Sequence, residues 1–491
     1  PYWLPEKLEA LDRSTKNKIK GIIITQKHLD AEVIIALKKL KIPVVYGVDR
    51  EEYSKIVLAA AVVLNSNGAI MGIDRPVRGA ADADDENLAL DMKTTNLQEL
   101  RGVVDTSQGP TEVIAIVNGG DREVAEQQFS RVAKQIFRAD GATRIMAHEE
   151  TMRRGQFLGL LDAMRHWKEE QGPFDKEGVA LGIMMPGKGT RLSPLTQRLH
   201  GIKPFMQILV RNSKIGKWLS GAAASLYSWT LVVYHLKRMG FRGIAWKWGD
   251  EPEIAAQLLS LLKMDLSEVD AVRFGSNVVV TEDLAKSKEW LFVDPKTGNL
   301  IKQVRRRPRT ELLKQFGITE DLDRDVKAYV HIGSPAFSYI FLEEAEAVFG
   351  DLKGEKDWLD VDGCFFEALT RTQEEWDEEA ARFLEMKDYS LQEVLQICPD
   401  FYKRVQELKH RVDKRRGGKP MVIKVSDFCE QLYWGDIGQL KKARETLYEV
   451  NEATFKGEFA RRLALIEDVE PDKFGNRIIG DSLVPQDGSV R

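Results

Sequence analysis

Residues 178–210 read GVALGIMMPGKGTRLSPLTQRLHGIKPFMQILV, and this stretch decides the fold that we expect. It begins with a short, almost wholly apolar run over 179–185, which is typical of a strand buried on both faces. The following loop, PGKGTR at 186–191, has two glycines that let backbone N–H groups approach an anion closely. Three cations accompany this loop: Lys188, Arg191 and Lys203. The stretch therefore predicts a buried strand that leads into a polyphosphate-binding loop.

A second motif overlaps this loop. The spacing G-x4-GK from Gly182 to Lys188 is that of a Walker A loop. The next residue is Gly189, where a Walker A loop needs Ser or Thr to hold magnesium. The first glycine of the motif would also lie inside the apolar run. Both departures argue against a Walker A loop.

The string G-x-GTRL-x-PLT at 187–196, followed by Lys203-Pro204, resembles the signature of the sugar-1-phosphate nucleotidyltransferases. This family includes the glucose-1-phosphate uridylyl-, thymidylyl- and adenylyltransferases. Its second signature, W-x-D-x-G, is matched at 434–438, and the matches follow the family's order over residues 178–451. The resemblance implies an α/β fold with a GT-A/Rossmann-like mixed-sheet nucleotidyltransferase core.

The resemblance also implies roles for residues of the loop. Arg191 and the loop N–H groups would bind the β- and γ-phosphates of a nucleoside triphosphate, and Lys203 would lie near the α-phosphorus, so both are candidate catalytic residues. The candidate nucleotide-binding residues are Gly187, Lys188, Gly189 and Thr190.

Two carboxylates are candidates for holding Mg²⁺, which prefers hard oxygen ligands. Asp436 belongs to the second signature. Asp250 follows the strand expected at 244–248, and ligands of open α/β sheets bind at such strand ends. An alternative interpretation leaves Asp250 without this role, because 239–262 can also be the family's second helix–strand–helix unit.

The sugar side of the site departs from the family. A hairpin is expected at 290–304 because PKTG separates its two strands. In the family this hairpin leads into Glu-Lys-Pro, but here the tripeptide is Arg306-Arg307-Pro308. Arg307 could still meet a phosphate, whereas the Glu is missing. A later strand resembles the family's Asn-x-Gly-x-Tyr, with His331 in place of the Asn and Gly333 at the Gly. His can donate or accept a hydrogen bond to a sugar hydroxyl.

The domain organisation follows from the chain's length and from its strand and helix patterns. The chain has 491 residues, enough for two or three domains. The divisions that we expect are an N-terminal α/β domain over 1–150, a connecting helix over 151–177, a nucleotidyltransferase-like domain over 178–455 with a charged helical insertion at 351–420, and a loosely held tail over 456–491. Within the first domain, strands are expected at 20–25, 43–46 and 112–117, helices at 30–41 and 51–64, and a loop at 75–96.

Composition limits the partners. A net charge of −4 offers no bulk electrostatic case for nucleic acid. Three widely separated cysteines favour a reducing compartment, so we expect a cytoplasmic protein. The longest apolar stretch, 221–236, is interrupted by His235 and is short for a membrane span. The expected partners are a nucleoside triphosphate, a sugar-1-phosphate and, as an open option, further copies of the chain.

The sequence is compatible with three functions. The first is transfer of a nucleotidyl group from a nucleoside triphosphate to a sugar-1-phosphate with release of pyrophosphate. The second is a nucleotidyltransferase-like regulatory or scaffolding subunit, which the missing Glu, the extra N-terminal domain and the charged insertion favour. The third is a glycosyltransferase, which would need an Asp-x-Asp motif. That spacing occurs at 323–325 and 360–362, in charged loop or helix context.

Overall fold

The computed structural model divides into two compact units. One comprises Pro1–Met92 and Gln257–Lys263, and the other Lys93–Ala256 and Met264–Arg491. The structure describes 22–24, 44–46, 62–64, 70–72, 83–105, 109–118, 123, 127, 143–152, 154–185, 207–211, 218–256, 264–320, 322, 324–354, 357–360, 364–385, 389–430, 432–435, 444–446, 449–451 and 454–465.

The small unit contains a four-stranded sheet in the order β2-β1-β3-β4. Its strands are β1 (Ile22–Ile24), β2 (Val44–Tyr46), β3 (Val62–Leu64) and β4 (Ile70–Gly72). β1 pairs in parallel with β2 and β3, and β4 is antiparallel to β3. The strands predicted at 20–25 and 43–46 are confirmed. The helix predicted at 51–64 is wrong in its last turn, where the apolar run VVL forms β3 instead.

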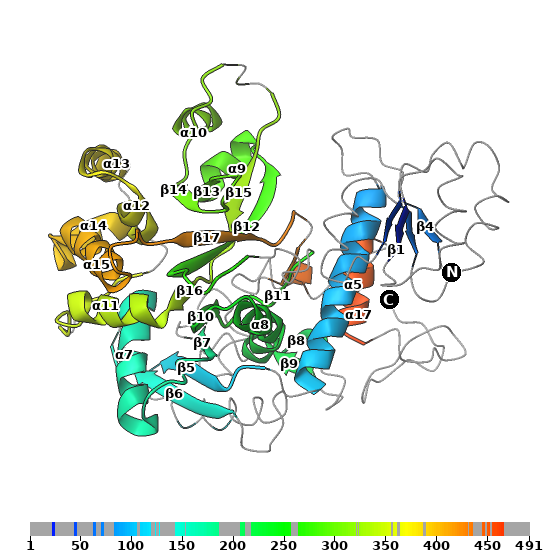
Figure 1. Cartoon of the computed structure of the whole chain (residues 1–491), viewed down its shortest axis with the longest axis horizontal. Helices are drawn as coiled ribbons and strands as arrows, with labels where there is room; N and C mark the ends of the chain where they lie inside the picture. Colours follow the sequence, from blue (N-terminus) through cyan, green and yellow to red (C-terminus); the bar gives the residue numbers. More distant parts are fainter. Residues whose placement is uncertain are drawn as a thin grey trace. The chain divides into compact units, whose positions relative to one another are not determined.

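The large unit is built on a mixed ten-stranded sheet (Figure 1), which confirms the α/β class. The order is β14-β13-β15-β12-β16-β10-β7-β5-β6, and β17 pairs with β12. The strands are β5 (Glu112–Asn118), β6 (Arg144–Glu150), β7 (Val179–Met184), β10 (Gly243–Trp248), β12 (Ala271–Val279), β13 (Trp290–Val293), β14 (Leu300–Val304), β15 (Lys327–His331), β16 (Ala336–Ser338) and β17 (Ile423–Asp427). Neighbours among β10, β7, β5 and β6 are parallel, whereas β16, β15 and β13 run antiparallel to their partners.

β7 lies inside this sheet, between β5 and β10, as its apolar sequence predicts. Five of its six residues are buried. β5 and β6 come from the part of the chain that we expected in the N-terminal domain, yet they pair with β7 and with each other. The expected boundary near residue 150 thus falls inside the large unit. Strand patterns predict local conformation, whereas a strand's partner is chosen by packing.

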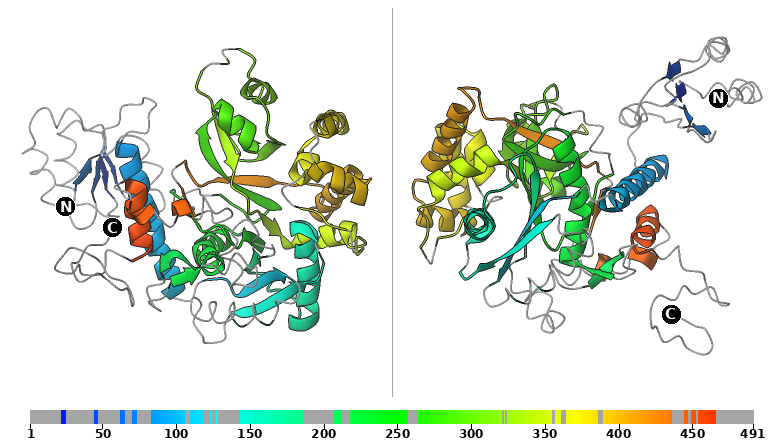
Figure 2. Two further views of the ribbon diagram at one scale, coloured as in Figure 1. Left: turned by 180° about the vertical axis from the view of Figure 1, so that it is seen from behind. Right: turned by 60° about the horizontal axis from the view of Figure 1, so that its bottom comes forward.

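Helices cover both faces of the sheet (Figure 2). α8 (Gly221–Arg238) packs against β7 and β10 on one face, and its Ser220 cap accepts a hydrogen bond from Ala223 N. On the other face, α7 (Gly155–Gln171) and α11 (Tyr339–Phe349) share one apolar cluster with Ile114, Trp246 and Phe337 of the sheet. No helix among the described residues is long and apolar enough to cross a bilayer.

The helical insertion extends this second layer. It comprises α12 (Phe365–Thr370), α13 (Gln373–Glu385), α14 (Tyr389–Ile397) and α15 (Phe401–Arg415). These helices confirm the helical character expected for residues 351–420. The basic run at 411–419 is held by carboxylates: Arg411 and Arg415 contact Glu344, and Lys419 contacts Glu268.

The hairpin β13–β14 is antiparallel, as predicted. α9 (Glu282–Ser287) and α10 (Arg309–Gln315) form a separate apolar cluster with it, in which Trp290 and Leu312 are fully buried. The remaining elements are β8 (Gln207–Arg211), β9 (Trp218–Ser220), β11 (Glu253–Ile254), β18 (Tyr433–Trp434) and the 3-10 helix η5 (Glu449–Asn451). β8 pairs with β9 and β11 with β18, outside the large sheet.

Two predicted irregular segments contain helices. α5 (Ala83–Asp105) replaces much of the loop expected at 75–96, and α17 (Phe455–Leu463) lies where the tail was expected to begin. The buried positions of α5 recur every three or four residues, but they include Lys93 and Asn96. Because these two positions are polar, the sequence does not show the apolar periodicity of an amphipathic helix. Phe459 of α17 packs 5.5 Å from the ring of Tyr433, which gives the helix an apolar partner.

Candidate functional site

The candidate site lies at the edge of the sheet where three parallel strands end. In register, Ile116 of β5 pairs with Met184 at the end of β7, which pairs with Trp248 at the end of β10. Met185 N donates to Ile116 O at 2.9 Å, and Gly249 N donates to Met184 O at 2.8 Å. The loop at 186–191 therefore starts beside the strand end that carries Asp250. Polar groups gathered at the carboxyl ends of parallel strands commonly form ligand sites.

The predicted nucleotide and catalytic residues themselves lie outside the described residues. These are Gly187, Lys188, Gly189, Thr190, Arg191 and Lys203. What the structure describes is the strand that leads to them.

Gly182, the first glycine of the Walker A spacing, has a packing role in β7. It pairs with Trp246 of β10, and a Cβ at Gly182 would lie 2.1 Å from Cε3 of that indole. The absence of a side chain lets the Trp246 ring lie across the strand. This supports the sequence argument against a Walker A loop, because the glycine is inside a strand and not at the start of a phosphate loop.

Asp250 is half-buried in the turn that follows β10. The strand after it, β11, begins at Glu253, where the alternative interpretation expected a helix; residues 257–263 lie outside the described part of the chain. Because β10 is the direct neighbour of β7, Asp250 and the glycine loop leave the sheet at adjacent points. A position at the end of the strand next to β7 is the one that the metal-ligand interpretation of Asp250 expects.

Asp436 is outside the described residues, but the chain immediately before it is described. β18 pairs antiparallel with β11, so that Trp434 lies opposite Glu253 and Tyr433 opposite Ile254. Gly435 N also donates to Pro252 O at 2.9 Å. The residue before Asp436 is therefore hydrogen-bonded to the turn that holds Asp250.

The donor chemistry at this turn suits Mg²⁺. Among the described residues, no group of three His, Cys, Asp or Glu side chains could hold a metal ion. Mg²⁺ does not need such a group, because one or two carboxylates plus substrate phosphates and water complete its coordination. Asp250 and Asp436 would be those carboxylates. Nearby, the buried Oε1 of Glu253 has no hydrogen-bond partner in the described part of the chain.

Gly333 is brought to the same edge. It has φ +85°, a conformation that favours glycine, and a Cβ placed on it would meet Nε1 of Trp248 at 3.7 Å. Trp246 N donates to Pro335 O at 2.8 Å, which fixes this turn against β10. Gly333 therefore lies against the strand end that precedes Asp250.

His331, at the end of β15, faces inward. Its Nε2 lies 3.0 Å from Gly333 N and 3.1 Å from Gly333 O, and its side chain is 7% exposed. Burial lowers the pKa of His331 well below its usual range, and the charge of Arg273 adds to this effect. A neutral imidazole is the form that donates one hydrogen bond and accepts another.

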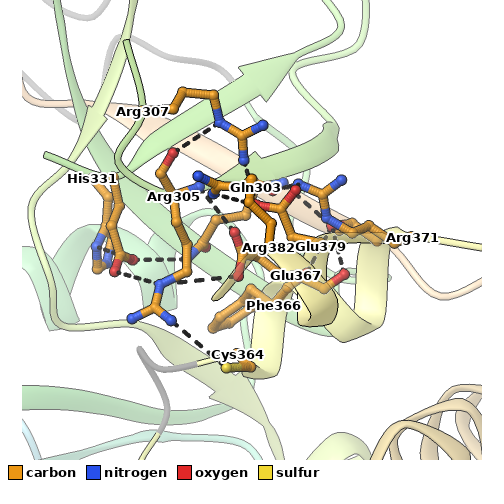
Figure 3. A network of polar contacts seen from close by, with 12 residues as sticks. Gln303, Arg305, Arg307, His331, Cys364, Phe366, Glu367, Arg371, Glu379 and Arg382 are labelled. Carbon is orange, nitrogen blue, oxygen red and sulfur yellow. Dashed lines mark hydrogen bonds and ion pairs between the residues drawn. The ribbon is translucent and has the colours of Figure 1, made fainter. Parts of the chain in front are cut away.

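Arg307 does not join the other candidates. Its guanidinium is buried and ion-paired with Glu379 of the helical insertion, and its Nε donates to Arg305 O at 3.2 Å. Figure 3 shows the network to which it belongs, with His331 and Arg305 at one end and Arg371 at the other. A guanidinium held in this way is already neutralised by a carboxylate. Of the arginines 305–307, Arg306 is the exposed one.

Sequence reasoning missed the polar residues that surround His331. Arg305 Nε lies 3.5 Å from Glu289 Oε1, and Glu289 Oε2 lies 4.0 Å from His331 Nδ1. Glu367 of α12 accepts a hydrogen bond from Arg305 N at 2.9 Å. These residues come from separate elements with no common motif. A Glu placed directly before the apolar strand β13 was the only local signal for one of them.

The chain matches no known protein-family model, and a search of curated proteins found no match either.

Proposed function

We propose that this protein is a nucleotidyltransferase with a GT-A/Rossmann-like core, which joins a nucleotidyl group from a nucleoside triphosphate to a sugar-1-phosphate. One observation carries the proposal. The glycine- and cation-rich loop and Asp250 follow neighbouring parallel strands at one sheet edge, and the residue before Asp436 is hydrogen-bonded to the Asp250 turn. A triphosphate and its counter-ion need cations and carboxylates in this proximity.

The reaction requires charge neutralisation and alignment more than covalent chemistry, since both reactants are anions. A phosphate oxygen of the sugar-1-phosphate attacks the α-phosphorus in line, the bond to the bridging oxygen of the β-phosphate breaks, and pyrophosphate leaves. Arg191 and the loop N–H groups bind the departing phosphates, and Lys203 stabilises charge at the α-phosphoryl group. Mg²⁺, when bound, would supply positive charge that offsets the charge of the phosphates. Asp250 and Asp436 would hold it.

The sugar side of the proposal rests on Gly333 and His331. A Cβ at Gly333 would be in ordinary van der Waals contact with Trp248, and the neutral ring of His331 lies beside Gly333. Because Arg307 is buried, the candidate for the expected phosphate contact is Arg306, which is exposed.

In a second candidate function, the site binds a nucleotide or sugar phosphate but catalyses no reaction. The observation that favours it is the Arg307–Glu379 ion pair. In an active member of the family, the cation at this position would bind the sugar phosphate, whereas here Glu379 neutralises it. In this case the protein binds nucleotide or sugar phosphate as a regulatory subunit.

The test combines the purified full chain with Mg²⁺, a panel of nucleoside triphosphates and a panel of sugar-1-phosphates, with coupled detection of pyrophosphate. We expect pyrophosphate from at least one pair, and Arg191→Ala should reduce the rate by about 100-fold or more. Lys419→Ala, an exposed residue paired with Glu268, is the control and should keep the native rate. Nucleotide binding without pyrophosphate from any pair would favour the regulatory subunit instead.

A further inference from the structure

A fully buried ion pair flanks the turn that carries Asp250. Lys247 lies in β10 and Glu253 begins β11, so the two residues stand three positions before and after Asp250. Lys247 Nζ lies 3.1 Å from Glu253 Oε2, and both side chains are 0% exposed. The pair therefore closes the base of the turn with a side-chain contact.

Two other elements hold this pair in one geometry, α8 and the turn that precedes β16. Trp229 of α8 donates its indole N–H to Glu253 Oε2 at 3.1 Å, and its ring lies 5.2 Å from Lys247 Nζ. Lys247 also donates to Ser334 Oγ at 3.3 Å. Ser334 has φ 34°, a left-handed conformation that costs energy in a residue other than glycine. The Ser334 hydroxyl also accepts a hydrogen bond from Trp248 N at 3.4 Å, so it contacts both Lys247 and the end of β10.

Stability alone does not account for the pair. Replacing a buried ion pair by uncharged side chains of similar volume is often neutral or stabilising, because burying two charges is costly. Burial raises the pKa of Glu253, and the charge of Asp250 adds to this rise while Lys247 opposes it. Lys247 thus offsets the repulsion between two carboxylates that stand at the same turn.

The pair also connects to the segment of the second carboxylate. Glu253 is the residue of β11 that stands opposite Trp434 of β18, and its N–H donates to Ser228 Oγ of α8 at 3.3 Å. Gly435 N donates to Pro252 O, next to Glu253. Any shift of Glu253 would therefore move both the Asp250 turn and the chain that leads to Asp436.

We infer that Lys247 and Glu253 are positioning residues, which hold the turn that carries Asp250 in the geometry required to bind a divalent cation. This inference rests on the proposed function, because it assigns the cation to Asp250. Partners of this kind behind metal ligands change metal affinity by about 10- to 100-fold when they are replaced.

The experiment titrates the full-length protein with Mn²⁺ alone and follows free Mn²⁺ by electron paramagnetic resonance. The main variant, Lys247→Met/Glu253→Gln, removes both charges and keeps an acceptor for Trp229. We expect it to unfold within a few degrees of the native protein and to bind Mn²⁺ at least about 10-fold more weakly. Asp250→Asn removes the proposed carboxylate ligand itself, and its Mn²⁺ affinity is the reference for complete loss of that ligand.

The matched control removes a largely buried ion pair at the opposite edge of the sheet. Arg416 NH1 lies 3.2 Å from Asp270 Oδ2, beside the amino end of β12. The variant Arg416→Met/Asp270→Asn should keep native Mn²⁺ affinity. A second variant, Glu253→Asp, keeps the carboxylate but shortens its side chain by one methylene. It tests the same inference if the main variant does not fold. It should weaken Mn²⁺ binding as well.

The outcomes separate this inference from the proposed function. Native Mn²⁺ affinity in a folded Lys247→Met/Glu253→Gln protein, or in Glu253→Asp, together with weakened binding in Asp250→Asn, overturns the positioning role alone. Equal binding by the native protein and Asp250→Asn overturns the cation site, and the positioning role with it.

Discussion

Gly182 shows how the absence of one side chain sets the packing between two strands. Trp246 has no exposure to solvent, and its ring occupies the space above Gly182. In the sequence, the glycine could be counted toward a phosphate motif. Its environment instead explains why the apolar run 179–185 contains a residue with low strand propensity.

Replacement of Gly182 by Ala should destabilise the protein. A Cβ there would lie 2.1 Å from the Trp246 ring, so the indole or the strand must move, and overpacking of this kind costs about 1–3 kcal/mol. Urea unfolding measures the loss. Gly102→Ala is the control, since a Cβ there meets nothing within 4 Å, and in a helix this change should be neutral or stabilising by about 0.5–1 kcal/mol. In Gly182→Ala/Trp246→Leu the two losses should be less than additive; simple additivity would contradict the clash.

Three carboxyl groups should make stability depend on pH near neutrality. Burial, the largest cause in each case, raises the pKa of Asp270 to about 6, of Glu150 to about 7 and of Glu367 to about 8. A carboxyl whose folded pKa is raised adds stability below its unfolded pKa, and this contribution is lost as the pH rises through the folded pKa. Stability should therefore fall between about pH 5 and pH 8 on account of these groups.

Glu367→Gln tests this expectation at one residue. Glutamine does not titrate, so the variant should gain stability relative to the native protein as the pH rises from 5 to 8. Glu367 is fully buried, and we expect a change of about 1–3 kcal/mol in the difference between the two free energies of unfolding. Denaturant titrations at pH 5, 6.5 and 8 give that difference. A constant difference across the three would mean that Glu367 is ionised throughout.

At the scale of elements, a charged network joins the helical insertion to the hairpin β13–β14. Glu379 of α13 is contacted by three guanidinium groups: Arg307, Arg382 at 2.6 Å and Arg371 at 3.8 Å. Gln303 N, in β14, donates to Thr370 Oγ1 at 3.2 Å. The insertion is therefore packed against the sheet beside the candidate sugar-binding residues and is not a separate module.

The network predicts unequal effects for its members. Glu379→Gln leaves three arginines without their shared carboxylate and should cost about 3–5 kcal/mol, as does breaking a buried ion pair. Arg307→Met leaves Glu379 with two partners and should cost less. Chemical denaturation compares the two, with the exposed Glu378→Gln as the control, expected within about 0.5 kcal/mol of the native protein. A larger loss for Arg307→Met would contradict this account.

α5 shows why a helix can be missed when it is predicted from the pattern of polar and apolar residues. Lys93 lies 5.1 Å from the Phe459 ring, and Asn96 donates to Ala255 O at 2.6 Å. Both residues are buried by partners far away in the chain. A polar residue facing the core looks like an interruption of the apolar stripe until its partner is known.

At the scale of the whole molecule, the large unit contains all ten strands of its sheet in residues after 111. The small unit's strands lie between residues 22 and 72. The later part of α5 belongs to the large unit, where Glu99 contacts the buried His235 at 3.2 Å and Thr94 accepts from Arg462 at 2.7 Å.

A chain that starts at Ala83 should therefore keep the large unit folded. We expect one cooperative thermal transition by circular dichroism, within a few degrees of the corresponding transition of the full chain. A chain that starts at Gly109 loses α5 and its contacts with Ala255, His235 and Arg462, and it should unfold at a clearly lower temperature. Loss of the cooperative transition in the longer fragment would contradict an independently stable large unit.

The sequence by itself determined the elements with strong local patterns. The apolar run of β7, the turn chemistry of the β13–β14 hairpin and the regular amphipathic pattern of α15 each depend on neighbours in the chain. It also determined the composition of the glycine loop and the two candidate carboxylates, and from these the proposal of a nucleotide site.

Only the tertiary structure decided which of these parts meet. It paired β5 and β6 with β7, set Asp250 beside the start of the loop, and placed the chain before Asp436 against Pro252. It also turned Arg307 toward Glu379 and buried Lys247 with Glu253. The physical reason is the same throughout. Strand pairing and the neutralisation of buried charge join residues far apart in sequence, so no local pattern specifies the partner.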